Sequence, residues 1–317
     1  MGWLNGWNYR KSHEIDGSSA GAQTDYQKRI KVHYGSGSDG DDDVYCSSHC
    51  KTDFGDIRFT KSDETSLLDY WIEKQVNSDY ADIWVEVDSV PASPSSATIY
   101  IYYGKGDATT TSDGEDTFIF FDGFPGDSLD LNKWDVIEGA PSVADGILTL
   151  SASTHIETDN EWNVNHAYRI RTRSNDGYAD RGWMGGYGGA GSGFFFWRFL
   201  NWGDTKAGTE SNDGVASEKN DDMEVGSILV LRVFEGQRTA ANVYFTIDDV
   251  LKATHAVRRP TGTLSASIRC WLGTTYNDWA LVRKFVDPEP IHGDWGVEES
   301  IVIPTVTTQD ATDIGVV

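Results

Sequence analysis

Residues 97–124 constrain the fold of this chain more than any other stretch, because two strand patterns flank a polar spacer there. The first pattern, ATIYIYYG, alternates β-branched and aromatic residues and stops at Gly104, as a β-strand that ends at a turn does. The spacer KGDATTTSDGED has the composition of a loop that is long enough to flex, and TFIFFDGF begins another apolar run. We interpret the stretch as the last strand of one β-domain, a tether, and the first strand of a second domain.

The rest of the sequence supports two all-β domains in series. A length of 317 residues is enough for two buried cores, and 33 Gly with 12 Trp, 14 Tyr and 13 Phe favour many strands joined by turns. Alternating segments such as YQKRIKVHY and ADIWVEV predict six or seven short strands before the spacer. We therefore predict a β-sandwich over residues 1–116, a second β-domain over 117–298, and over 299–317 a linker with the start of a further module.

Charge excludes two classes of partner. The formal net charge is −24 and the pI is about 4.5, so nucleic acid and anionic membrane are both repelled. The sequence holds no apolar run long enough to span a membrane, and its N-terminus lacks the apolar core of a signal peptide.

The first domain resembles a known family through several motifs in order. These are W-x-YR near the start, DIRFT (56–60), DYWIE (69–73), IWVEV (83–87) and IYIYYG (99–104). Their succession is similar to domain of unknown function 2341, which occurs in large secreted or surface proteins of bacteria and archaea. The resemblance implies a β-sandwich and an extracellular, cell-surface or virus-surface location, and it implies no reaction.

The second domain resembles the concanavalin A-like jelly rolls, which include lectins, laminin-G-like modules and β-glucanases. The motifs are F-x-x-F, L-D-x-x-K-W and D-G-x-L-x-L near its start and D-W-x-x-V-R-K near its end. The resemblance implies a jelly roll whose last strand pairs near its first. It also implies a structural calcium ion at Asp122, Gly146 and Asp278, with hydrogen bonds to backbone amides as the alternative role of the buried carboxylates.

One acidic motif, HIETDNEW, raises the question of catalysis. On a regular strand, Glu157, Asp159 and Glu161 face one way, and retaining jelly-roll glucanases use a similar E-x-D-x-E arrangement. The motif follows D-G-x-L-x-L directly, on what should be a peripheral strand, and polar Thr158 and Asn160 separate its acids. A solvated edge that binds cations is the alternative, and we assign no catalytic residues.

Aromatic residues in Gly-rich or turn-bounded segments are candidates for sugar binding, because sugar C–H faces stack on such rings. Arg198 in GFFFWRFLNW marks the wetter face of its strand, so Trp197 is predicted to lie in the core. The candidate ligand-binding set consists of Trp183, Tyr187, Arg198, Trp202 and Tyr276.

Two smaller features lie in the first domain. Asp39, Asp41 and Asp43 in a Gly/Ser loop are a candidate second cation site, with a solvated acidic loop as the alternative. Cys46 and Cys50 are close enough in sequence to form a disulfide if oxidised, which leaves Cys270 single.

The sequence thus predicts a non-catalytic extracellular recognition module within a larger surface or fibre protein. Its expected partners are a glycan or polysaccharide and neighbouring modules of the same polypeptide, and its expected cofactor is calcium. A jelly-roll glycoside hydrolase or lyase is one alternative, and a structural spacer or filament subunit is another.

Overall fold

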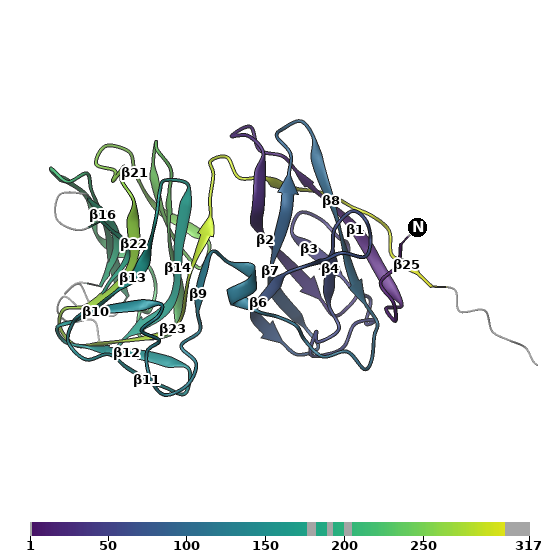
Figure 1. Cartoon of the computed structure of the whole chain (residues 1–317), viewed down its shortest axis with the longest axis horizontal. Coiled ribbons are helices and arrows are strands. Elements are labelled where there is room, and N and C mark those ends of the chain that lie inside the picture. The colour runs from purple at the N-terminus through teal and green to yellow at the C-terminus, as the bar shows by residue number, and fades with distance from the viewer. Residues whose placement is uncertain (1, 176–181, 189–192, 200–204, 302–317) are drawn as a thin grey trace, which may run out of the picture.

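The structure, a computed structural model, describes residues 2–175, 182–188, 193–199 and 205–301. Within these residues the chain forms four β-sheets that make two sandwiches, which stand side by side in Figure 1. The helix found in this part of the chain, α1 (Gly114–Thr117), lies where the chain passes from one sandwich to the other. The predicted all-β class with two sandwich domains is confirmed.

The first sandwich pairs a four-stranded sheet with a six-stranded sheet around one core. In the four-stranded sheet, Ile30 and Val32 are buried while Lys31 between them is partly exposed, as the alternation of YQKRIKVHY predicts. Its strand order is β3 (Asp43–Tyr45), β2 (Gln23–His33), β7 (Tyr80–Val90) and β6 (Tyr70–Val76). The order of the six-stranded sheet is β24 (Ile291–Trp295), β1 (Tyr9–Asp16), β8 (Ser96–Tyr103), β4 (Arg58–Thr60) and β5 (Leu67–Leu68), and β25 (Glu299–Ser300) also pairs with β1.

The end of the described chain returns to the first sandwich. Strands β24 and β25 run antiparallel to β1, with His13 opposite Trp295 and Tyr9 opposite Ser300. In Figure 1 this yellow segment crosses back from the second sandwich and ends beside β1. The second sandwich is therefore inserted between β8 and β24, whereas the predicted division placed residues up to 298 in the second domain and began a linker at 299. The physical reason is that β1 has a free edge, which these strands cover.

The second sandwich pairs a seven-stranded sheet with an eight-stranded sheet. The order of the seven-stranded sheet is β10 (Trp134–Glu138), β13 (Thr154–Trp162), β22 (Leu264–Cys270), β15 (Gly182–Tyr187), β16 (Phe194–Phe199), β17 (Lys206–Asn212) and β18 (Ser217–Glu224). The order of the eight-stranded sheet is β11 (Ser142–Ala144), β12 (Ile147–Ser151), β23 (Thr274–Lys284), β14 (His166–Ser174), β19 (Arg232–Arg238), β20 (Val243–Ile247) and β21 (Val250–His255), and β9 (Phe120–Asp122) also pairs with β23. The last strand of this domain thus pairs with its first, as the jelly-roll resemblance implies.

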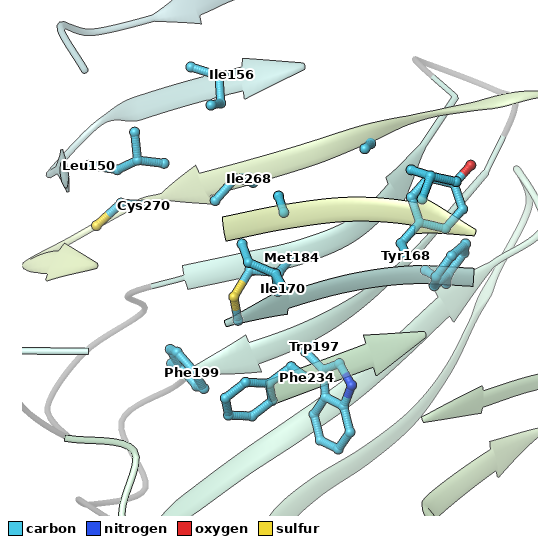
Figure 2. Close-up of a cluster of buried hydrophobic side chains, with 14 of the residues drawn as sticks. Leu150, Ile156, Tyr168, Ile170, Met184, Trp197, Phe199, Phe234, Ile268 and Cys270 are labelled. Atoms are coloured by element: carbon cyan, nitrogen blue, oxygen red, sulfur yellow. The ribbon is translucent and has the colours of Figure 1, made fainter. Parts of the chain in front are cut away.

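Aromatic and aliphatic side chains from both sheets fill the core between them. Figure 2 shows Trp197 beside Phe234, with ring centroids 5.4 Å apart, and Met184 beside Ile170. Trp197 is 1% exposed, and its indole Nε1 donates to the carbonyl oxygen of Glu235 at 2.9 Å. The prediction that Trp197 faces the core is confirmed.

The spacer between the sandwiches is attached to the first of them. The backbone N–H of Asp113 donates to the Tyr70 carbonyl oxygen at 2.9 Å, and that of Thr111 donates to the Tyr70 hydroxyl at 3.1 Å. The backbone N–H of Ile72 donates to the Ser112 hydroxyl at 2.8 Å. The interpretation of this spacer as a tether that is fixed only at its downstream end is wrong, because residues 111–113 also bond to β6 of the first sandwich.

The two sandwiches share an apolar contact. One buried cluster joins them, and it consists of Trp84 from the first sandwich, Phe118 from the segment between α1 and β9, and Trp279 and Leu281 from β23 of the second sandwich. The Trp71 and Trp279 rings meet edge to face with centroids 5.2 Å apart. The first sandwich therefore packs against the part of the eight-stranded sheet's outer face that β23 forms.

Buried charges cross the same contact. On β14, the Arg169 guanidinium lies 2.9 Å from a Glu73 carboxylate oxygen of the first sandwich and 2.7 Å from one of Asp249. It also lies 3.5 Å from a Glu235 oxygen and 5.4 Å from the ring centroid of Trp84. The Arg169 side chain is 1% exposed and that of Glu73 is 8% exposed, so this pair joins the sandwiches out of water.

Candidate functional site

Because the first sandwich packs against the eight-stranded sheet of the second, the outer face of the seven-stranded sheet is left for a ligand. Its strands send alternate side chains into the core, among them Ile156, Met184 and Ile268. The residues between these point to the outer face. We define the central group as the side chains on β13, β22 and β15 that meet at the middle of this face: His155, Glu157, Ser265, Ser267 and Tyr187.

Hydrogen bonds tie the polar members of the central group together. His155 Nε2 lies 2.9 Å from Glu157 Oε1 and 3.0 Å from Ser267 Oγ. Ser265 Oγ donates to the Tyr187 carbonyl oxygen at 2.9 Å and lies 3.3 Å from Glu157 Oε2. Both contacts of His155 fall on one nitrogen, whereas a Ser–His–acid relay needs both ring nitrogens. The group therefore offers hydrogen-bonding capacity and not an activated serine.

An aromatic surface adjoins this polar group. The Tyr187 ring is partly exposed, meets His155 edge to face with centroids 6.0 Å apart, and lies parallel to Phe196 at 6.2 Å. Phe194, also partly exposed, stacks on Phe196 with centroids 4.9 Å apart. A partly exposed ring beside a carboxylate and hydroxyls can stack on one face of a ligand and bond its polar edge.

The acidic motif is not a regular strand. Glu157 lies opposite Ser267 and Glu161 opposite Ser265, so three residues of β13 stand against the single residue Ala266 of β22. Thr158 Oγ1 accepts the hydrogen bond of the Ala266 backbone N–H at 2.9 Å within this bulge. The bulge brings Glu157 and Glu161 to neighbouring positions on the face, where four regular residues would separate them further. Strand β13 is also not the edge of its sheet, because β10 covers it.

A further carboxylate, which the sequence analysis did not single out, adjoins the motif. Asp135 lies opposite Glu157 across the β10–β13 ladder. Its negative charge and a side-chain hydrogen bond raise the pKa of the exposed Asp159 carboxyl. This end of the face is therefore strongly anionic.

The structure divides the predicted ligand-binding residues. Tyr187 and Arg198 share the outer face, but the Arg198 guanidinium is bound by Glu210 at 3.0 Å and by Asp221. Tyr276 lies on β23 in the opposite sheet, with the Arg173 guanidinium 3.9 Å from its ring centroid. Tyr276 therefore does not share a site with Tyr187. Trp202 and the Trp183 side chain lie outside the described residues.

The predicted calcium ligands have other partners. Burial raises the pKa of the Asp122 carboxyl, which accepts hydrogen bonds from Trp134 Nε1 and from the Phe124 backbone N–H, both at 2.7 Å. Asp278 pairs with Arg171. Gly146 has a φ of +73° in the turn between β11 and β12. Asp122 thus has a backbone-amide donor, the alternative role, whereas Asp278 has a guanidinium partner. Calcium stays a prediction for metal analysis.

The acidic loop of the first sandwich is likewise divided among partners. The Asp39 carboxylate accepts from Lys11 Nζ at 2.6 Å and from the Tyr45 backbone N–H at 2.8 Å. Asp43 lies 2.6 Å from His33 Nε2, while Asp41 is exposed. Across the described residues, no group of three or more His, Cys, Asp or Glu is arranged to hold a metal ion. The second cation site remains a prediction.

Cys46, Cys50 and Cys270 are buried, and no disulfide joins them in the structure. Burial, followed by a hydrogen bond to the neighbouring Cys50, raises the pKa of the Cys46 thiol. The two thiols are therefore adjacent, and a disulfide between them under oxidising conditions stays a prediction.

The sequence analysis missed two features of the second sandwich. One is Trp271, which is 48% exposed directly after β22. The other is the row Arg169, Arg171 and Arg173 on β14, where three cations at alternate positions indicate a face that meets acidic partners. The alternating arginines of HAYRIRTRS could have predicted this basic face from the sequence.

Comparison with known proteins gives one family match. Residues 53–137 match the family model described as a domain of unknown function (DUF2341). No curated protein matches the sequence. In the described part of the chain, no helix has the length and apolar character needed to cross a membrane.

Several solved structures are similar to about half of the chain. The β-glucanase of Bacillus licheniformis has a TM-score of 0.45 and 12% identity, over 52% of this chain and 97% of its own. The laminarinase of Rhodothermus marinus has a TM-score of 0.45 and 15% identity, over 53% of this chain and 97% of its own. The endo-β-1,3-glucanase of Pyrococcus furiosus has a TM-score of 0.45 and 13% identity, over 53% of this chain and 94% of its own. These similarities are too remote to carry an argument about activity.

Proposed function

We propose that the chain is a non-catalytic carbohydrate-binding module of an extracellular surface or fibre protein. The observation that carries this proposal is the central group, in which the ring of the partly exposed Tyr187 meets the His155 ring, and His155 in turn contacts the Glu157 carboxylate and the Ser267 hydroxyl. A sugar offers a C–H face to stack on such a ring and hydroxyls that donate to a carboxylate. The first sandwich, held to the second by Arg169 and Glu73, fixes the direction in which this face points.

Binding to immobilised glycans tests the proposal. We expect the wild type to bind at least one polysaccharide on a glycan array, Tyr187→Ala to lose that binding, and Glu157→Gln to weaken it. Tyr276→Ala is the matched control, because Tyr276 is also a partly exposed tyrosine but lies on the opposite sheet. Equal binding by Tyr187→Ala and Tyr276→Ala would place the site elsewhere, and no binding by the wild type would refute the proposal.

Hydrolysis of a glycosidic bond is the second candidate, favoured by the bulge in β13. Because Glu157 and Glu161 lie opposite residues only two apart on β22, their backbones are roughly 7 Å apart along the strand. Retaining and inverting glycosidases place their two carboxyl groups about 5–10 Å apart. Release of reducing sugar by the wild type, lost in Glu157→Gln and in Glu161→Gln, would establish this second function in place of the first.

A further inference from the structure

The outer face extends beyond the central group along β22. Ser265, Ser267 and Arg269 point outward at alternate positions, and Arg269 lies opposite His155. Trp271 continues this row, with the Arg269 guanidinium carbon 4.2 Å from its ring centroid. Of the aromatic side chains that the structure describes, Trp271 is the only exposed one. Among the described residues, this exposed indole at the end of a polar row has no apolar partner on its open side.

The length of the row from Ser265 to Trp271 indicates how long a ligand must be to contact both Tyr187 and Trp271. The Tyr187 ring centroid lies 6.0 Å from that of His155, and His155 Nε2 lies 3.0 Å from Ser267 Oγ, so the Tyr187 ring stands near Ser267. From Ser267 to Trp271 the backbone advances by four residues, roughly 14 Å at 3.4 Å per residue, which is more than one sugar ring bridges. A chain of several sugar units spans both rings.

The charge around the row indicates whether the polysaccharide is acidic or uncharged. Asp135, Glu138, Glu157 and Asp159 all lie on or beside β10 and β13, next to the row. Among the residues that the structure describes, Arg269 is the cation in this row, and Glu138 already lies 3.4 Å from its guanidinium. An acidic polysaccharide would meet uncompensated negative charge here, whereas an uncharged one would not.

We infer that this face binds an extended, uncharged polysaccharide, with Tyr187 stacking on one sugar ring and Trp271 on another several units along the chain. The inference rests on the proposed carbohydrate-binding function and specifies its ligand class. It also makes Trp271 a specificity residue for ligand length.

Affinity electrophoresis tests the ligand class. Native gels would contain barley β-glucan, laminarin or galactomannan as uncharged probes and alginate as the acidic probe. We expect retardation by at least one uncharged polysaccharide and none by alginate. Trp271→Ala should need about tenfold more polysaccharide for the same retardation, as expected for one lost aromatic contact. Trp271→Phe should recover most of the retardation.

Oligosaccharides of two and six units, prepared from the retarding polysaccharide, test ligand length by calorimetry. Trp271→Ala should weaken binding of the six-unit ligand and leave the two-unit ligand unchanged. Leu251→Ala is the control, because it removes a side chain that is 55% exposed on the other sheet. Thermal unfolding of each variant verifies that it is folded.

The outcomes separate the two levels of the proposal. If no polysaccharide retards the wild type, the proposed function fails. If Tyr187→Ala abolishes binding while Trp271→Ala binds the six-unit ligand like the wild type, the inference fails and the function stands. Retardation by alginate alone overturns the assignment of an uncharged ligand.

Discussion

Replacing Arg169 by Met tests whether the buried charges make the two sandwiches one cooperative unit. The substitution leaves Glu73, whose side chain is 8% exposed, without the cation that lies 2.9 Å from it. Glu235 keeps Arg283 at 2.7 Å and Asp249 keeps Arg29, so the loss concentrates on Glu73. Removing one partner of a buried ion pair costs about 3–5 kcal/mol, a large part of the roughly 5–15 kcal/mol that stabilises a typical fold. At roughly 2 °C per kcal/mol, the melting temperature should fall by about 6–10 °C.

Differential scanning calorimetry is the assay, with Arg171→Met as the matched control. Arg171 is the same residue type two positions along β14, but its side chain is 40% exposed and it pairs with Asp278, so its loss should cost at most about 1 kcal/mol. We expect one transition in the wild type and in the control, and two transitions in Arg169→Met, because the sandwiches no longer unfold together. Adding Glu73→Gln to Arg169→Met should recover part of the loss, because the stranded carboxylate is then neutral.

The reasoning is refuted if Arg169→Met and Arg171→Met melt within 1 °C of each other. Equal melting would mean that water or other cations compensate Glu73, and that the apolar cluster around Trp84 and Trp279 alone joins the sandwiches.

Three further measurements address other parts of the molecule. Burial lowers the pKa of His13 to about 3 and that of His292 to about 2. As the pH drops below about 6.5, the two histidines take up protons in the unfolded chain before they do so in the folded one. The free energy of unfolding should therefore fall with pH, by up to about 1.4 kcal/mol per pH unit for each histidine. Urea unfolding at pH 7.5 and 5.5 measures this, and equal midpoints would contradict it. Because Asp122 is already bonded by Trp134, a chelator should leave the melting temperature unchanged, whereas a lower melting temperature in chelator would support the calcium prediction. Oxidation should join Cys46 to Cys50 and reduce the intact mass by two hydrogens, whereas three alkylatable thiols in the unfolded oxidised chain would exclude that disulfide.

Local alternation predicted most of the strands and the inward-facing residues. The Phe195, Trp197 and Phe199 set was separable from its neighbours because Arg198 interrupts the other face of the strand, and all three are buried. The pairing of β23 with β9 followed from the jelly-roll resemblance. Such features depend on the period of the side chains within one segment or on a pattern shared by a family.

Features that depend on distant partners were not predictable from the sequence. The segment IHGDW carries no local sign that it pairs with β1, because the backbone ladder and the contacts of His292 and Trp295 all need the distant residue His13. The bulge in β13 is also invisible in HIETDNEW, since it depends on the register of β22. In the candidate site, Tyr187 and Glu157 were identified separately, but their meeting on one face required the order of the strands, and Tyr276 was assigned to that face although β23 belongs to the other sheet.

The return of the chain to β1 determines how the molecule would carry mechanical force. The backbone N–H of Ile301 donates to the Asn8 carbonyl oxygen at 3.0 Å, so residues 8 and 301 leave from the same end of one antiparallel ladder. Tension applied through these two points would open the ladder one pair at a time, from Tyr9 and Ser300 toward Asp16 and Ile291. The second sandwich, whose exit segment enters β24 at Ile291 opposite Asp16, would bear no load until the last pair opened. A glycan held there would be carried on an unstrained side branch while the rest of the protein is stretched.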